Sequence, residues 1–400
     1  MPPRGSKKAA KRASTEEPCP DGDMISALPD VLLQHVLGFV PAQDAVRTSV
    51  LGTRWRHLWR SMHHLRVTVR PLWSAEKQHM FVNRVLLLRD PRSTVDHWEL
   101  DLRGCKEANR NYTELWIRHA LLLQARVLEV RYTTVLESCP LVSRFLEVLR
   151  LERVYFESHT ALDLSSCFAL EDVEFCICEI GIYEIRCPPS VKRLSMVKCR
   201  FHDVVNGRHN DNHIRISAPS LTSLKIDGCD GLPPVLESMP SLQAASVSFG
   251  CSFEGDRSCS AGPCGKWLCF SCNEDVLRKK DGCVLLGGLS NATSLKYRGS
   301  FGMATFQMDL AFCPVFKNLK TFYLENCCLT GDLHALLRFL QLTPNLEKLT
   351  IELCEIWEKN AKAIRYVLNL QYKRELVELQ AIRHVLNFKL YLVCSSDLEE

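Results

Sequence analysis

A short apolar pattern recurs along most of this sequence and constrains its fold more than any other feature. The pattern is apolar-x-x-apolar-x-apolar, found between residues 97 and 354 in segments such as LEVLRLERV, VKRLSMVKC, LTSLKIDGC and LEKLTIELC. Its fourth position is occupied, in chain order, by Leu128, Leu149, Val173, Leu194, Leu224, Ala245, Leu295, Phe322 and Leu349. The intervals are 21, 24, 21, 30, 21, 50, 27 and 27. Most lie in or near the roughly 20 to 29 residues of a leucine-rich repeat.

Each unit of the pattern predicts one short strand. Alternation with period two turns Leu224 and Ile226 toward the core and Lys225 and Asp227 away from it. Segments such as PPVLESMP and LHALLRFLQLTP predict the short helices or turns that return the chain. Because a single unit cannot bury its apolar face, the units must stack into one continuous core. The fold class predicted for residues 97–354 is therefore α/β, a leucine-rich-repeat solenoid of parallel strands with short helices or turns.

Two alternatives remain within this region. The strands could belong to a sandwich, but a sandwich does not explain the repeated PSL and PNL openings at Pro219, Pro240 and Pro344. The interval of 50 equals about two repeats, so one unit there is either distorted or carries an insertion. We expect a cysteine-rich insertion at about 251–283.

That insertion raises the possibility of a zinc site. Cys269 and Cys272 are spaced C-x-x-C, and Cys259, Cys264 and Cys283 lie nearby. A structural zinc site needs four ligands, and these spacings do not form a clean pair of C-x-x-C motifs. Residues 251–272 also contain no histidine. We expect an irregular surface loop that could contribute to target binding, with structural zinc as the alternative.

Composition sets further limits on the class of protein. Among 400 residues, 46% are hydrophobic and 24% are charged, a globular balance that suggests two or three domains. The formal charge is +4, yet the first twelve residues contribute five basic side chains, at Arg4, Lys7, Lys8, Lys11 and Arg12. The rest of the chain holds 45 basic against 46 acidic residues, which disfavours nucleic acid as a partner. Residues 1–23 are expected to be a disordered basic tail, in which KKAAKR is either a nuclear import signal or part of a solvated segment.

The sequence also bears on the compartment. No apolar stretch of the signal-peptide type follows Met1, and no apolar run approaches the eighteen or so residues of a membrane span. Twenty cysteines without a secretory signal are expected to be reduced thiols. We therefore expect a cytoplasmic or nuclear protein, or one found in both, with no membrane partner.

Residues 24–62, hereafter the hook, hold three apolar stripes in a very short segment. Leu32, Leu33, Val36 and Leu37 share helical spacing, and Pro41 ends that run. Two further stripes include Val46, Val50 and Leu51, and then Trp55, Leu58 and Trp59. Three helices of this length have too little interior to cover so many apolar side chains. Part of this surface is expected to meet a partner protein.

The hook resembles the F-box of the plant F-box/leucine-rich-repeat family. The similarity lies in the LPD opening, the LL..VL.F.P helix, the DAVRTSVL helix and the RW..LW ending. Other stretches resemble the same family: FVNRVLLLRD, WIRHAL, LDLSSCFALEDVEF, APSLTSLKI and DGCVLLGGLSNATSLK. The resemblance implies a three-helix hook that docks on an SKP-type adaptor and, through it, on the cullin of a ubiquitin ligase. The chain would be the substrate-recognition subunit, and its target protein is unknown.

The resemblance also implies which residues contact the adaptor. The residues that would meet it directly are Leu28, Pro29, Leu32, Leu33, Val36 and Leu37. Those that would be shared between the adaptor and the packing of the hook are Val46, Val50, Leu51, Trp55, Leu58 and Trp59. Residues 63–96 are expected to form a helical linker. Residues 355–400 do not show the closing module of many relatives, and the spacing of Leu376, Leu379, Ile382 and Leu386 predicts a C-terminal helical segment of unassigned type.

Nothing in the sequence predicts catalysis. It contains no G-x-S-x-G, no G-x-x-x-x-G-K-[ST] and no H-E-x-x-H motif, so no catalytic, cofactor-binding or metal-binding residue is assigned. Arg47, Arg54, Arg56 and Arg60 are scattered around their helices rather than aligned on one face, which disfavours a DNA-reading helix. Two alternative functions remain: an interaction scaffold that engages no ligase, and, less favoured, a zinc- or nucleic-acid-binding protein.

Overall fold

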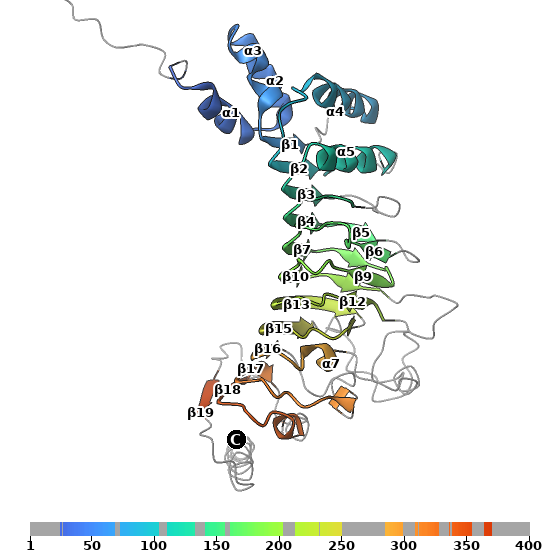
Figure 1. Cartoon of the computed structure of the whole chain (residues 1–400), viewed down its shortest axis with the longest axis vertical. Coiled ribbons are helices and arrows are strands. Elements are labelled where there is room, and N and C mark those ends of the chain that lie inside the picture. Colours follow the sequence, from blue (N-terminus) through green and yellow to red (C-terminus); the bar gives the residue numbers. More distant parts are fainter. Residues whose placement is uncertain are drawn as a thin grey trace, which may run out of the picture.

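The computed structural model describes a helical N-terminal part followed by a long curved stack of parallel strands (Figure 1). The residues it describes are 25, 27–68, 73–103, 110–132, 141–156, 161–202, 213–231, 233–249, 285–298, 309–310, 312–327, 336, 338–353 and 364–369. The predicted tail and the cysteine-rich insertion lie outside these residues. In the described part of the chain, no helix is long and apolar enough to cross a membrane.

The hook folds into short helices, the first two of which each follow a proline. These elements are α1 (Asp30–Gly38), α2 (Ala42–Arg47), the 3₁₀ turn η1 (Thr48–Val50), α3 (Trp55–Leu58) and the 3₁₀ turn η2 (Trp59–Ser61). Pro29 and Pro41 stand immediately before α1 and α2, where a missing backbone N–H costs nothing. Further helices with described bounds are α4 (Ala75–Leu88), α5 (Arg110–Leu122) and α7 (Leu286–Leu289). Ser74 caps α4 by accepting a hydrogen bond from the backbone N–H of Lys77.

One sheet runs along the whole described molecule. Its strands, in spatial order, are β1 (His64–Thr68), β2 (His97–Asp101), β3 (Val127–Arg131), β4 (Val148–Glu152), β7 (Asp172–Cys176), β10 (Arg193–Val197), β13 (Ser223–Gly231), β15 (Ala244–Phe249), β16 (Ser294–Arg298), β17 (Thr321–Cys327), β18 (Lys348–Leu353) and β19 (Ile364–Asn369). Neighbours up to β18 pair in parallel, and only β19 pairs antiparallel with its neighbour. Spatial order follows chain order, as expected when each repeat adds one strand.

The register of this sheet confirms the alignment of the sequence repeats. Leu128 stands opposite Leu149, Leu149 opposite Val173, and the same pairing continues through every predicted position to Leu349. Ala245 and Leu295 are direct neighbours although 50 residues separate them. Within the described residues, β15 therefore pairs directly with β16, and the insertion predicted at about 251–283 stays a prediction.

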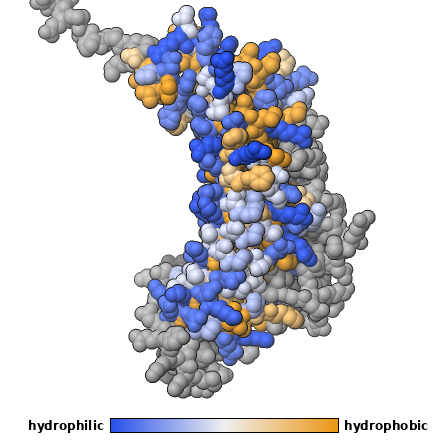
Figure 2. Space-filling view, in the orientation of Figure 1, coloured by the Kyte–Doolittle hydropathy of each residue, from blue (hydrophilic) through white to orange (hydrophobic). Residues whose placement is uncertain are grey.

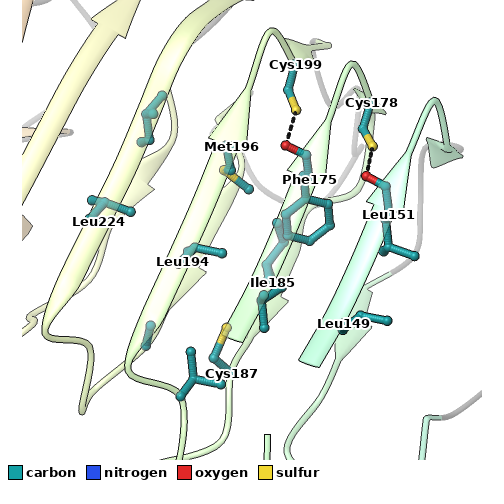
Figure 3. Close-up of a cluster of buried hydrophobic side chains, with 14 of the residues drawn as sticks. Leu149, Leu151, Phe175, Cys178, Ile185, Cys187, Leu194, Met196, Cys199 and Leu224 are labelled. Atoms are coloured by element: carbon teal, nitrogen blue, oxygen red, sulfur yellow. Dashed lines mark hydrogen bonds between the residues drawn. The ribbon is translucent and has the colours of Figure 1, made fainter. Parts of the chain in front are cut away.

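The core lies between this sheet and a second row of short strands. Behind it stand β5 (Tyr155–Phe156), β8 (Glu179–Ile180) and β11 (Arg200–Phe201), and a smaller parallel sheet of β6 (Ala161–Asp163), β9 (Glu184–Arg186), β12 (Arg215–Ser217) and β14 (Val235–Leu236). Figure 3 shows Leu151, Phe175 and Met196 projecting into this core from successive strands, with Ile185 facing them from β9. Where sequence analysis expected helices or turns to return the chain, these middle repeats use short strands.

A row of buried cysteines supports the bend after each middle strand. The thiols of Cys178 and Cys199 donate to the carbonyl oxygens of Leu151 and Phe175, at 3.2 and 3.6 Å. Cys229 repeats this contact one strand further on, with the carbonyl of Met196. Each buried thiol thus donates to a backbone carbonyl of the preceding strand of the sheet and links the bend to its neighbour.

The same bend requires a left-handed backbone. Tyr132, Arg153, Ile177, Lys198 and Gly228 occupy equivalent positions just after or near the end of their strands and have φ between +52° and +61°. Only the last is glycine. A β-branched residue such as Ile177 is strained in this region, so the repeat imposes the conformation against local preference.

Two expectations about the ends of the repeat region need correction. Residues 64–68 of the expected helical linker form strand β1, because Leu65 and Val67 alternate with polar residues and pair with β2. The linker does contain a helix, α4. Residues 364–369 of the expected C-terminal helical segment form strand β19, which pairs with β18. The residues on which that helix prediction depends, 376–386, lie outside the described part.

The hook and the sheet share one hydrophobic core. Helices α1 and α2 pack against β1, the first strand of the sheet. The side chain of Gln43 donates to the carbonyl of Thr68 at 2.6 Å, and Arg66 donates to the carbonyl of Phe39 at 3.2 Å. The hook therefore covers the outer edge of β1, which would otherwise expose unpaired backbone groups.

Candidate functional site

Helix α1 carries apolar side chains on two adjacent faces, one turned to the core and one turned to solvent. Its inner face places Leu33 and Leu37 in the core, at 0% and 3% exposure. Its outer face carries Leu32, Val36 and Phe39, which are 49%, 53% and 61% exposed. The outer residues have spacing i, i+4 and i+7, so they form one line along the helix. A helix that only covered a core would present polar residues there.

More apolar side chains lie exposed around this line. Ile25 and Val31 stand at the start of the hook, and Val50 and Leu51 precede α3. Figure 2 shows hydrophobic side chains gathered over α1 at the N-terminal end of the molecule. We call Ile25, Val31, Leu32, Val36, Phe39, Val50 and Leu51 the outer apolar surface of the hook. Its concentration within 27 residues distinguishes it from singly scattered surface residues.

The structure separates the twelve residues predicted from sequence into three groups. Exposed are Pro29, Leu32, Val36, Val50 and Leu51; partly buried are Leu28, Val46 and Trp55; buried are Leu33, Leu37, Leu58 and Trp59. Leu33 and Leu37 are enclosed by the chain's own core, and their predicted direct contact with the adaptor stays a prediction. Leu58 and Trp59 serve the packing of the hook.

Sequence reasoning missed three members of the outer apolar surface. Phe39 continues the line of Leu32 and Val36 by three residues, a signal present in the sequence. Val31 and Ile25 are exposed at the start of the hook but fit no predicted stripe. Only the packing of α1 against β1 shows which apolar residues remain outside.

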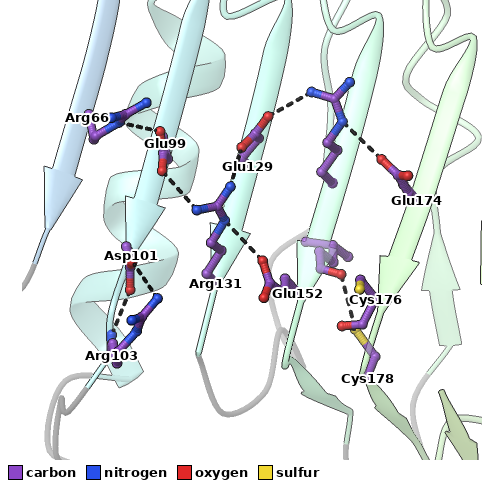
Figure 4. A network of polar contacts seen from close by, with 12 residues as sticks. Arg66, Glu99, Asp101, Arg103, Glu129, Arg131, Glu152, Glu174, Cys176 and Cys178 are labelled. Atoms are coloured by element: carbon purple, nitrogen blue, oxygen red, sulfur yellow. Dashed lines mark hydrogen bonds and ion pairs between the residues drawn. The ribbon is translucent and has the colours of Figure 1, made fainter. Parts of the chain in front are cut away.

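A network of charged side chains covers the face of the sheet at its N-terminal end. Arg131 lies 3.2 Å from Glu99 and 3.1 Å from Glu129, and Arg150 bridges Glu129 and Glu174 at 2.7 and 3.0 Å (Figure 4). Because guanidinium groups flank each buried carboxylate, the positive and negative charges on this face neutralise one another.

Two titratable groups of this network have shifted pKa values. The imidazole of His97, with Nε2 3.3 Å from Glu129 Oε1, and the guanidinium of Arg150 hold the pKa of Glu129 at about 2. Burial, and then the charge of neighbouring His97, lowers the pKa of His64 to about 4. Glu129 is therefore charged and His64 neutral at pH 7, as a structural network requires.

The described residues offer no group arranged for metal chemistry. No cluster of three or more His, Cys, Asp or Glu side chains in the described ranges could hold a metal ion. Burial raises the pKa of the Cys167 thiol to about 11 and that of Cys187 to about 12. Thiols kept neutral in this way are poor nucleophiles and poor ligands.

Comparison with known proteins agrees with this geometry. The family model for the F-box domain matches residues 25–66. The chain is 26% identical over 373 residues to the rice MEIOTIC F-BOX protein, a match covering 85% of this chain and 73% of that protein. An F-box/LRR-repeat protein of Arabidopsis thaliana is 28% identical, covering 56% of this chain and 82% of its own length. A putative FBD-associated F-box protein of Arabidopsis is 29% identical, covering 56% and 57%. No solved structure gives a significant match.

The N-terminal helices thus form an F-box, joined to a mixed α/β structure built on a parallel sheet. Beyond this domain, the chain is similar over more than half of its length to plant F-box/LRR and FBD-associated F-box proteins.

Proposed function

We propose that this chain is the substrate-recognition subunit of an SCF-type E3 ubiquitin ligase. The hook docks on an SKP-type adaptor, the adaptor joins it to a cullin, and the rest of the chain binds a target protein for ubiquitination. The chain performs no chemistry; it raises the effective concentration of target lysines near the conjugating enzyme. The observation that carries this proposal is the line of Leu32, Val36 and Phe39 on the solvent face of α1.

The energetics of the hook favour a protein partner for this surface. Moving a fully exposed leucine, valine or phenylalanine side chain into an interface contributes roughly 1.5 to 3 kcal/mol to binding. The outer residues of α1 are about half exposed, so each has about half of that contribution left to gain. Because the inner face already packs on the sheet, docking uses a preformed surface and orders little additional chain.

The repeat region is a leucine-rich-repeat solenoid in this proposal. Support comes from the spacing of the repeats and from the cysteines at 178, 199 and 229. They stand at the ninth position of L-x-x-L-x-L-x-x-N/C-x-L, where such repeats carry asparagine or cysteine. The solenoid holds the target at a fixed place relative to the hook, because both share one core. We also propose that the protein acts in the cytoplasm, the nucleus or both.

Titration of the full chain with a purified SKP-type adaptor tests the docking. Leu32→Asp places a charge on the outer face and should abolish measurable binding. Val142→Asp is a matched control, since Val142 is similarly exposed but lies in the repeat region. It should bind like wild type. Equal binding by all three chains would refute the proposal, and absence of binding by wild type would favour a scaffold that engages no ligase.

A further inference from the structure

One arginine connects two parts of the hook that are distant in sequence. Arg54, immediately before α3, donates from Nε to Asp30 Oδ1 at 2.7 Å, and its Nη2 lies 2.6 Å from the same oxygen. Nη2 also donates to the backbone carbonyl of Leu28. Asp30 is the first residue of α1. These contacts join residues that are 24 and 26 positions apart in the sequence, and they link the start of α1 to the start of α3.

The two segments joined by Arg54 both carry members of the outer apolar surface. On one side, Leu28 and Asp30 lead directly into Val31 and Leu32 of α1. On the other side, Leu51 stands three residues before Arg54. The contacts therefore set the position of the start of α1 relative to the turn before α3.

We propose that Arg54 is a positioning residue for adaptor docking. It holds the start of α1 against the start of α3, so that both parts of the outer apolar surface present one preformed shape. This inference rests on the proposed function and names a residue that contributes through geometry rather than through its own apolar contact.

An effect on docking should exceed the effect on folding. The side chains of Arg54 and Asp30 are 37% and 57% exposed, and exposed ion pairs contribute little to stability. Without the contacts, the start of α1 would sample more positions, and docking would have to order it again. Ordering of this kind costs on the order of 1 kcal/mol, which corresponds to about a fivefold loss of affinity.

The hook also contains a matched control. Arg47 pairs with Asp44 at 3.2 Å, but these residues are three apart within α2. This pair is exposed like the first and closes no gap between helices. Removing it should change neither the shape of the outer apolar surface nor adaptor affinity.

The experiment is a calorimetric titration of full-length chains with a purified SKP-type adaptor. The chains are wild type, Arg54→Ala, Asp30→Ala, the double variant of these two, Arg47→Ala and Leu32→Asp. We expect Arg54→Ala to bind about fivefold more weakly and Asp30→Ala to lose less, because Arg54 then keeps its contact with the Leu28 carbonyl; the double variant should lose little more than Arg54→Ala, because both changes break the same ion pair. Arg47→Ala should match wild type. Thermal unfolding of Arg54→Ala should stay within a few degrees of wild type.

The possible results separate the two proposals. If Leu32→Asp abolishes binding while Arg54→Ala retains wild-type affinity, the positioning role is wrong and the docking proposal stands. If the losses for Arg54→Ala and Asp30→Ala simply add, the two residues act independently, which also overturns the role. If Leu32→Asp binds like wild type, the docking proposal itself fails.

Discussion

Replacing Glu129 by glutamine should remove one distinct part of the acid sensitivity of this fold. Glu129 is 8% exposed, its carboxylate lies 3.3 Å from His97 Nε2 and 2.7 Å from Arg150, and these two groups hold its pKa at about 2 against an ordinary value of 4.5. At about 1.36 kcal/mol per pKa unit, this difference corresponds to about 3 kcal/mol of stability. Because Arg150 is exposed to solvent screening, we treat that figure as an upper bound.

The sign of the pH dependence follows from the lowered pKa. In the unfolded chain Glu129 takes up a proton near pH 4.5, whereas in the folded chain it does so only near pH 2. Its stabilising contribution is therefore complete above about pH 5 and is lost as the pH falls from about 4.5 to 2. Glu129→Gln should be less stable than wild type at pH 7, and this difference should shrink toward pH 3.

Urea denaturation followed by circular dichroism at pH 7, 5, 4 and 3 measures this difference. Glu174→Gln is the control, since Glu174 also pairs with Arg150, at 3.0 Å, but is half exposed. It should change the free energy of unfolding by about 1 kcal/mol or less at any pH. Equal denaturation midpoints for Glu129→Gln and wild type at pH 7, or a constant difference down to pH 3, would refute the reasoning.

Four further substitutions test the packing. Leu33→Ala should lower the free energy of unfolding by about 2 to 5 kcal/mol, because Leu33 is buried. Leu32→Ala should lower it by under about 1 kcal/mol but should weaken adaptor binding. A larger loss of stability for Leu32→Ala than for Leu33→Ala would contradict the assignment of the two faces of α1. Ile177→Asn should raise the free energy of unfolding by about 0.5 to 1 kcal/mol, seen as a higher thermal midpoint, because asparagine tolerates the left-handed backbone. A lower midpoint would show that contacts of Ile177 outweigh its strain. Cys199→Ala should cost about 0.5 to 1.5 kcal/mol in urea denaturation, since it removes the thiol hydrogen bond to the carbonyl of Phe175, and an unchanged midpoint would rule out that contribution.

The repeat strands could be predicted because two signals agreed there. Alternation fixed the buried side of each strand, and repeat spacing fixed which residues would be neighbours, so that Ala245 and Leu295 were aligned across 50 residues. Strand β1 was missed because its five residues lie outside the counted repeats, in a segment dominated by the helical pattern of α4. The pairing of β19 depends on its contact with β18 rather than on a repeat.

The candidate site was predicted as a segment but not residue by residue. Leu32, Leu33, Val36 and Leu37 fit one broad helical stripe, and spacing alone cannot tell which side of it a neighbouring element covers. Strand β1 decides this by packing against α1. The contacts of Arg54 with Asp30 were equally invisible, because they join residues 24 apart through a fold that the sequence only outlines.

Hydrogen–deuterium exchange of the full chain, free and with a purified SKP-type adaptor, tests the central claim most directly. We predict that the adaptor slows exchange in residues 28–39 and 50–55, which carry or adjoin the outer apolar surface, and leaves strands β13 to β18 unchanged. Unchanged exchange across the hook under conditions where the adaptor is bound would contradict the claim that this surface docks it.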